Sequence, residues 1–191
     1  MVKLMAGALV ALSLAVPAGP ATGGAATGAQ LDGLFVEGDS LTIGSSSAIK
    51  ANLSAEFRSI TVDAEVGRST PTGISRLAAG QSANVWVLAL GTNDAPDAKT
   101  MRRNVKTVLA RAGSRPVLWV SVWRSAEYAR VNRMLSRQDA KSSQLSVLRW
   151  DLFIKSNPQY LAGDRIHLTS AGYEVRGAMI ADAVRALLGS R

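Results

Sequence analysis

The sequence has 191 residues, of which 47% are hydrophobic and 19% are charged, and it contains no cysteine. A chain of this length can bury the core of one domain, and the absence of cysteine excludes disulfides and a lipid attached to a leader cysteine. Lys and Arg number 22 against 14 Asp and Glu, which gives a net charge of +8. This balance favours contact with anionic polymers or a membrane surface, or it serves solubility alone. No helix-turn-helix signature or aromatic–basic platform indicates nucleic-acid binding.

The amino-terminal segment has the pattern of a Sec-type signal peptide. A short basic start precedes an apolar run over residues 4–16, and a stretch rich in Ala, Gly, Pro and Thr follows it. The apolar run is short for a membrane span, so an uncleaved anchor is the less favoured alternative. We therefore expect a signal peptide over residues 1–29, one domain over residues 30–191, and export to the cell envelope or the medium.

The remaining chain alternates short apolar runs with helical patterns. Apolar runs typical of buried strands occur at residues 34–36, 60–62, 85–90, 117–122 and 145–150. Helices are expected over residues 43–57, 71–79, 100–112, 128–135 and 171–188. In the first helix, the residues spaced to share one face are Ile43, Ala48, Leu53 and Phe57. Strands alternating with helices predict an α/β fold: a single flavodoxin-like, doubly wound domain with a five-stranded parallel sheet in the order 2-1-3-4-5 and helices on both faces.

Ser40 lies where the first strand ends and the first helix begins. A hydroxyl at such a turn is exposed on a rigid support, next to the free N–H groups of the helix start. Gly38 permits a tight turn, and Asp39 can accept backbone N–H bonds. This is suitable geometry for a nucleophile whose attack creates an oxyanion. The alternative is that Ser40 only caps the helix.

The predicted topology brings the residues after strands two and three to the same crevice. Asn93 follows the third strand, and its amide could donate to an oxyanion, which a carboxylate could not. Gly67 follows the second strand and could offer a bare backbone N–H. Both positions are also compatible with ordinary turns.

His167 is the only histidine of the chain and precedes the last helix. From a loop it can approach Ser40 as a general base, and Asp164 can bond the other ring nitrogen and set the tautomer. Asp94, which follows Asn93, is the alternative orienting group. One histidine with scattered carboxylates predicts no metal site, and no cofactor-binding motif is present.

Four sequence blocks in this order resemble the SGNH, or GDSL-type, hydrolase superfamily over Leu34 to Leu188. They are Gly38-Asp39-Ser40, Gly67, Gly91-Thr92-Asn93-Asp94 and Asp164-Arg165-Ile166-His167. The resemblance implies Ser40 as nucleophile, His167 as general base and acid, and Asp164 as orienting residue. It also implies an oxyanion hole formed by the backbone N–H groups of Ser40 and Gly67 and the amide of Asn93. The likeness is closest to the extracytoplasmic SGNH domain of peptidoglycan O-acetyltransferases.

The expected protein is an exported serine esterase or acyltransferase acting on O-acyl esters, above all O-acetyl esters, through an acyl-serine intermediate. The expected partners are an acyl ester substrate, a cell-wall glycan and anionic envelope polymers, with no nucleic acid and a monomeric state. One alternative is a catalytically silent scaffold that binds the cell wall. Another is a lipase or thioesterase acting on longer acyl chains.

Overall fold

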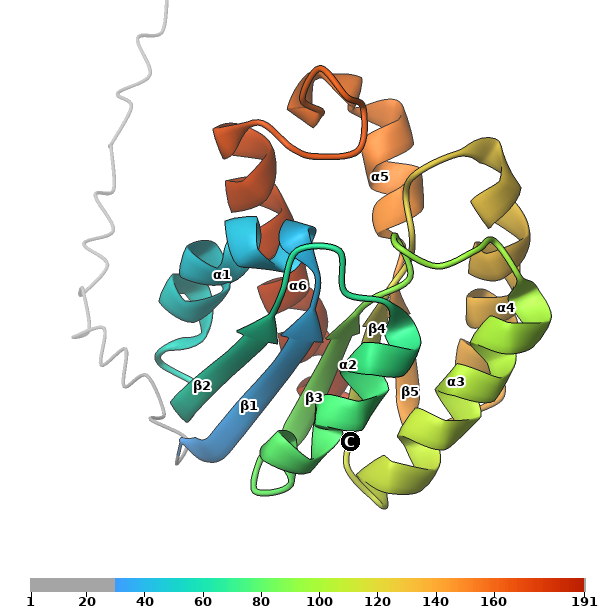
Figure 1. Ribbon diagram of the computed structural model, residues 1–191. Coiled ribbons are helices and arrows are strands. Elements are labelled where there is room, and N and C mark those ends of the chain that lie inside the picture. Colours follow the sequence, from blue (N-terminus) through green and yellow to red (C-terminus); the bar gives the residue numbers. More distant parts are fainter. Residues whose placement is uncertain (1–29, 191) are drawn as a thin grey trace, which may run out of the picture.

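The computed structural model describes residues 30–190, so the predicted signal peptide lies outside the described residues. The centre of the domain is a five-stranded parallel sheet in the order β2-β1-β3-β4-β5 (Figure 1). The strands are β1 (Leu31–Gly38), β2 (Phe57–Ala64), β3 (Val85–Ala89), β4 (Val117–Val120) and β5 (Leu145–Leu148). This order is the predicted one, and the doubly wound α/β fold is confirmed.

The α-helices are α1 (Ser40–Leu53), α2 (Thr70–Arg76), α3 (Ala98–Ala112), α4 (Ala129–Asp139), α5 (Trp150–Ser156) and α6 (Ser170–Gly189). Short 3-10 helices lie at η1 (Leu77–Gly80), η2 (Ala126–Tyr128) and η3 (Pro158–Tyr160). Within residues 30–190, no helix combines the length and apolar character needed to cross a membrane.

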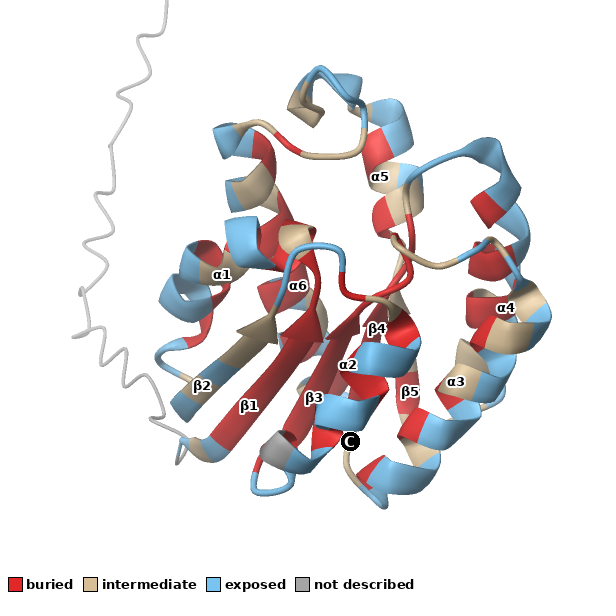
Figure 2. Cartoon of the chain, viewed as in Figure 1, coloured by how far each residue is buried: buried red, intermediate tan, exposed pale blue. Residues whose placement is uncertain are grey.

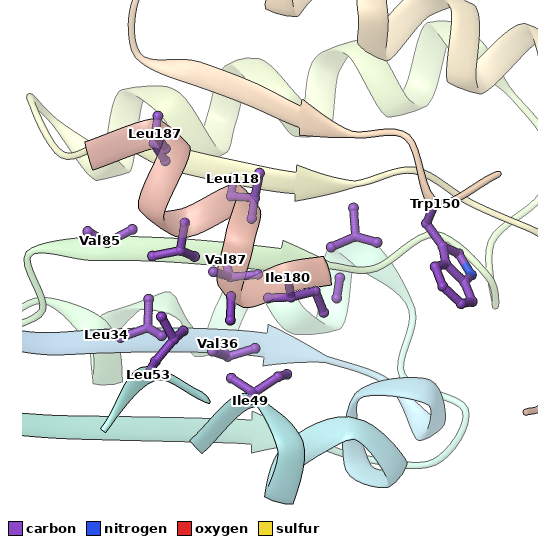
Figure 3. Packing of buried hydrophobic residues seen from close by; sticks show 14 of the residues in the cluster. Leu34, Val36, Ile49, Leu53, Val85, Val87, Leu118, Trp150, Ile180 and Leu187 are labelled. Atoms are coloured by element: carbon purple, nitrogen blue, oxygen red, sulfur yellow. The ribbon is translucent and has the colours of Figure 1, made fainter. Parts of the chain in front are cut away.

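Both faces of the sheet are covered. Alternate residues of a strand point to opposite faces, so Leu34 and Val36 of β1 pack against α1 and α6, whereas Phe35 packs against α2 and α3. Figure 3 shows the first of these layers, in which Ile49 and Ile180 approach the sheet. The central strands β1, β3 and β4 are almost wholly buried (Figure 2). The rigid core therefore fixes the position of the loops at its carboxyl edge.

Two predictions place a residue in the wrong element. The first helix ends at Leu53, and Phe57 begins β2 instead of completing the helical face, while Ile43 is 45% exposed. The run at residues 145–150 is divided, because Trp150 starts α5, a helix that the sequence did not predict. At seven residues, α5 is too short to display a helical period.

Candidate active site

Ser40 is the first residue of α1, directly after β1. The helix is capped by Asp39, whose Oδ1 accepts the Leu41 N–H at 3.0 Å, so the idea that Ser40 is merely the cap is wrong. Because α1 starts here, the Ser40 N–H has no intrahelical acceptor. Among the described residues, no other group accepts it. The turn therefore presents a half-buried hydroxyl beside an unengaged N–H.

The structure brings the three residues of the predicted triad into one hydrogen-bonded chain. Ser40 Oγ lies 3.0 Å from His167 Nε2, and His167 Nδ1 lies 2.6 Å from Asp164 Oδ2. Ser40 and His167 are separated by 127 positions in the sequence. The ring is thus positioned to exchange a proton with the Ser40 hydroxyl while the carboxylate holds its opposite nitrogen.

The loop that carries His167 is shaped by Asp164. Asp164 Oδ1 accepts the N–H groups of Ile166 and His167 at 3.0 and 2.9 Å, and Arg165 adopts a positive φ of 60° in this turn. Trp123 Nε1 donates to the Arg165 carbonyl at 3.1 Å and fastens the loop to the end of β4. The hydrogen bond with His167, supported by the two backbone N–H groups, lowers the pKa of Asp164 to about 2.

Gly67 and Asn93 lie at the same edge of the sheet. The Glu65 N–H donates to the Gly38 carbonyl at 3.3 Å, which ties the loop after β2 to the turn before Ser40. Gly67 has a φ of +76°, a conformation that favours glycine, and no described residue accepts its N–H. Asn93 Nδ2 lies 3.5 Å from Asp39 Oδ2 and donates to the Arg68 carbonyl at 3.2 Å. The amide is therefore held between the two neighbouring loops.

The Asn93→Ala variant should lower kcat by roughly 10² to 10³ with little change in KM, because an oxyanion exists chiefly in the transition state. Steady-state kinetics on a small ester measure the effect. Asn93→Asp is the matched variant, since it keeps the shape of the side chain and removes the donor. If the loss appears wholly in KM, Asn93 binds substrate and does not stabilise an oxyanion.

A buried charge network supports the Gly67 loop, and our sequence reasoning missed it. Glu37 is fully buried, and its Oε1 accepts from Arg68 Nη1 at 2.5 Å. The same nitrogen lies 2.8 Å from Asp63 Oδ1, and Arg68 Nη2 lies 3.3 Å from Glu65 Oε2. Since the Arg68 carbonyl accepts the Asn93 amide, this network links β1 and β2 to Asn93. A glutamate inside an apolar strand was the available signal, because buried carboxylates require a partner.

Glu37 should make stability fall with rising pH. Burial raises its pKa from 4.5 to about 7, against the opposing effect of Arg68. The unfolded chain then releases the proton first, so the contribution of Glu37 is complete below pH 4.5 and is lost as the pH rises through 7. Relative to Glu37→Gln, the free energy of unfolding should fall by up to about 3 kcal/mol over this interval.

Urea unfolding at pH 5, 6, 7 and 8 checks this expectation. The charged groups around Glu37 are Arg68, Asp63 and Arg76. Glu174→Gln is the matched control for the loss of one carboxylate, because Glu174 is an exposed residue of α6 outside this network. If the free energy of unfolding instead rises with pH, the effect of Arg68 on the pKa of Glu37 outweighs the effect of burial.

A second buried charge lies behind the turn that carries Ser40. Arg176 of α6 is 2% exposed, donates to the Leu41 carbonyl and to Ser45 Oγ, each at 3.3 Å, and lies 5.9 Å from the Trp150 ring centroid. Burial raises the pKa of Asp39, and the charge of Arg176 opposes that rise. Arg176 therefore anchors the start of α1 to α6, a contact that the helical pattern of residues 171–188 did not reveal.

A cavity of about 510 Å³ lies at the carboxyl ends of β4 and β5. Its lining combines apolar residues such as Trp123 and Leu152 with the basic residues Arg133, Arg149 and Lys155. Trp123 lines the cavity and is also hydrogen-bonded to the His167 loop, through the Arg165 carbonyl. Tyr128, which precedes α4, is buried and donates from its hydroxyl to the Asp94 carbonyl.

Asp94, the alternative orienting group, serves a different element. Its Oδ1 accepts the Thr70 N–H at 2.9 Å, at the start of α2, whereas the His167 ring bonds Asp164. Within residues 30–190, no three His, Asp or Glu side chains are grouped to hold a metal ion.

Solved structures with this architecture include several ester-processing enzymes. The C-terminal catalytic domain of the Streptococcus pneumoniae peptidoglycan O-acetyltransferase A is 19% identical, with a TM-score of 0.66 over 84% of this chain and 94% of that one. The Clostridium thermocellum family 3 carbohydrate esterase is 13% identical, with a TM-score of 0.67 over 83% and 98%. The esterase EstA of Pseudoalteromonas sp. is 13% identical, with a TM-score of 0.67 over 83% and 99%.

No protein-family model matches the sequence, and no curated protein matches it significantly. The similarity of this chain to known proteins is therefore a similarity of structure. Other solved structures of the same shape are described as a GDSL-like lipase from Parabacteroides merdae and a lipolytic protein of the G-D-S-L family from Desulfitobacterium hafniense. The predicted resemblance is confirmed at the level of the fold: this chain has the fold of the SGNH, or GDSL-type, hydrolases.

Proposed function

We propose that this protein is an exported serine esterase or acyltransferase that acts on O-acetyl esters through an acyl-Ser40 intermediate. The observation that carries the proposal is the continuous chain from Ser40 Oγ through the His167 ring to Asp164, with distances of 3.0 and 2.6 Å. A serine that only stabilised a turn would need neither an imidazole nor a carboxylate behind it.

The reaction follows from the positions of these groups. His167 Nε2 takes the proton as Ser40 Oγ bonds to the ester carbonyl carbon, and the Asp164 carboxylate stabilises the resulting imidazolium. The oxyanion is placed towards the N–H groups of Ser40 and Gly67 and the amide of Asn93. When the tetrahedral species collapses, the alcohol leaves with the proton from His167. Water or an acceptor hydroxyl then attacks the acyl-serine by the same steps in reverse.

Two features support a short acyl group and a glycan alcohol. His167 and Asp164 are about half exposed, with side-chain exposures of 43% and 49%, so a bulky sugar can reach the reacting atoms. Structural neighbours include a carbohydrate esterase, an acetyl esterase and a peptidoglycan O-acetyltransferase domain. A secreted or envelope location, reached through the predicted signal peptide, agrees with a cell-wall substrate.

A panel of p-nitrophenyl esters from acetate to decanoate, with and without a chitooligosaccharide acceptor, tests this function. We expect acetate to give the highest kcat/KM, and acceptor-dependent acetylated products would identify transfer. Preference for decanoate would indicate a lipase or thioesterase. No turnover of any ester, together with binding to isolated cell walls, would indicate a silent wall-binding scaffold.

A further inference from the structure

The basic charge of this protein is concentrated in one quarter of the chain. Residues 97–141 contain eleven of the 22 Lys and Arg residues and three of the 14 Asp and Glu residues. The other described residues carry nine basic and eleven acidic side chains. The positive net charge therefore belongs to a single segment and is not spread over the surface, as a charge that served solubility alone could be.

The fold gathers this segment onto one side of the molecule. Helices α3 and α4 contact one another and pack on the same face of the sheet, in the second core layer (Figure 1). Their apolar residues, such as Val105 and Leu135, face that core, so their opposite faces are exposed to solvent (Figure 2). We call the exposed cations on these two helices the basic flank: Lys99, Arg102, Arg103, Lys106, Arg111, Arg130, Arg133, Arg137 and the adjoining Lys141.

The cations of the basic flank are not neutralised within the described domain. None of them forms an ion pair with a described carboxylate, although other arginines such as Arg68, Arg149 and Arg185 do. The segment has only three acidic residues, namely Glu127, Asp139 and Asp97, which accepts the N–H groups of Lys99 and Thr100 as the cap of α3. Unpaired like charges repel one another, and an external polyanion would relieve that repulsion.

The spacing of the cations suits a linear partner. On α4, Arg130, Arg133 and Arg137 follow one another at intervals of three and four residues, so they form a row along one side of the helix. Neighbours in such a row are about 5–6 Å apart. A chain with one phosphate in each short polyol repeat could place successive charges opposite successive arginines.

The chemistry of the basic flank argues against two other anionic partners. The exposed large apolar residues of the described domain are Ile43, Val66 and Leu152, and none of them lies on α3 or α4. An interfacial membrane helix would require such residues to enter the lipid. Single-stranded nucleic acid would require exposed aromatic rings for base stacking, and neither helix contains an aromatic residue.

We propose that the basic flank binds a polyol-phosphate polymer and so holds the protein on an anionic envelope. One end of the basic flank lies at the carboxyl edge of the sheet, because Arg133 also lines the cavity at the ends of β4 and β5, whose Trp123 donates to the Arg165 carbonyl of the His167 loop. A chain bound along α4 would therefore run towards the carboxyl edge of the sheet, where Ser40 lies. Binding of this kind is independent of ester turnover.

The experiment measures binding of the purified protein to synthetic poly(glycerol phosphate) by titration calorimetry between 50 and 300 mM NaCl. The Arg130→Gln, Arg137→Gln double variant should bind at least about tenfold more weakly, with a salt slope smaller by about one for each phosphate that is no longer neutralised. The matched control is Lys50→Gln, Arg58→Gln, which removes two exposed cations away from the basic flank and should change the affinity by less than about twofold. Thermal melting of each variant verifies folding.

An equal decrease in affinity in both double variants would overturn the proposal, because binding would then depend on net charge alone. Unchanged binding in the Arg130→Gln, Arg137→Gln variant would also overturn it. Tighter binding to phosphatidylglycerol vesicles or to a single-stranded oligonucleotide than to the polymer would assign the basic flank to another partner. Because Ser40→Ala should bind the polymer like the unmodified protein, failure here leaves the ester chemistry to be judged separately.

Discussion

The Ser40→Ala variant should keep the fold and lose turnover by a factor of about 10⁴ to 10⁶, because it removes the atom that we propose forms the acyl intermediate. Alanine fits the first position of α1, and the cap of this helix is supplied by Asp39 and not by Ser40. Circular dichroism and thermal melting should therefore match those of the unmodified protein. Steady-state rates on p-nitrophenyl acetate measure the loss.

Labelling provides an independent measure of the same residue. A sulfonyl fluoride or an organophosphonate should modify Ser40 alone, since His167 lies 3.0 Å from its Oγ and can activate it. The matched control is Ser47→Ala, an exposed serine on the same helix, which should keep full activity and full labelling. An adduct that mass spectrometry places on Ser45, Ser46 or Ser47 would contradict the assignment.

The Asp164→Asn variant should lower kcat by about 10² to 10⁴, because an amide can stabilise the wrong tautomer of His167 and cannot support the imidazolium. The oxygen of asparagine can still accept the two backbone N–H groups that Asp164 Oδ1 now accepts. The loop should therefore keep its shape while the electrostatic support is lost. Retained labelling of Ser40, at a lower rate, would separate this effect from unfolding.

The pH profile identifies which group titrates. In the unmodified protein, kcat/KM should rise with increasing pH along a single limb, since only neutral imidazole can take the proton of Ser40. With its pKa lowered to about 2, Asp164 stays ionised between pH 5 and 9, so it cannot produce that limb. If Asp164→Asn changes neither the rate nor the limb, another group orients the ring. A flat profile would exclude a histidine base when chemistry limits the rate.

Much of the fold could be predicted because its central strands are uniformly apolar. Buried strands such as β3 and β4 exclude polar residues on both faces, so their positions are visible in the sequence. The short helix α5 was not visible, since its Trp150 continues the apolar character of β5. What distinguishes the two elements is packing, because Trp150 lies under Arg176 of α6.

The candidate site also contains residues that the sequence predicts and residues that it does not. Ser40, Gly67 and Asn93 follow strands that neighbour one another, so the strand order alone predicts that they meet. Glu37, Arg68 and Arg176 lie under the site, and their importance depends on burial and on partners from other elements. Pairwise contacts of this kind leave no periodic pattern in the chain, which is why sequence reasoning missed them.

The sequence by itself determined the alternation of strands and helices, the turn that carries Ser40, the single histidine and the excess of positive charge. These depend on local residue preferences and on residue types that occur once. Only the tertiary structure decided that Ser40 Oγ and His167 Nε2 lie 3.0 Å apart and that Asp164 holds the ring. It also decided that the cations of α3 and α4 share one flank, because this requires both helices to pack on one face of the sheet. Distances between remote residues are set by the packing of the core, and no local pattern encodes them.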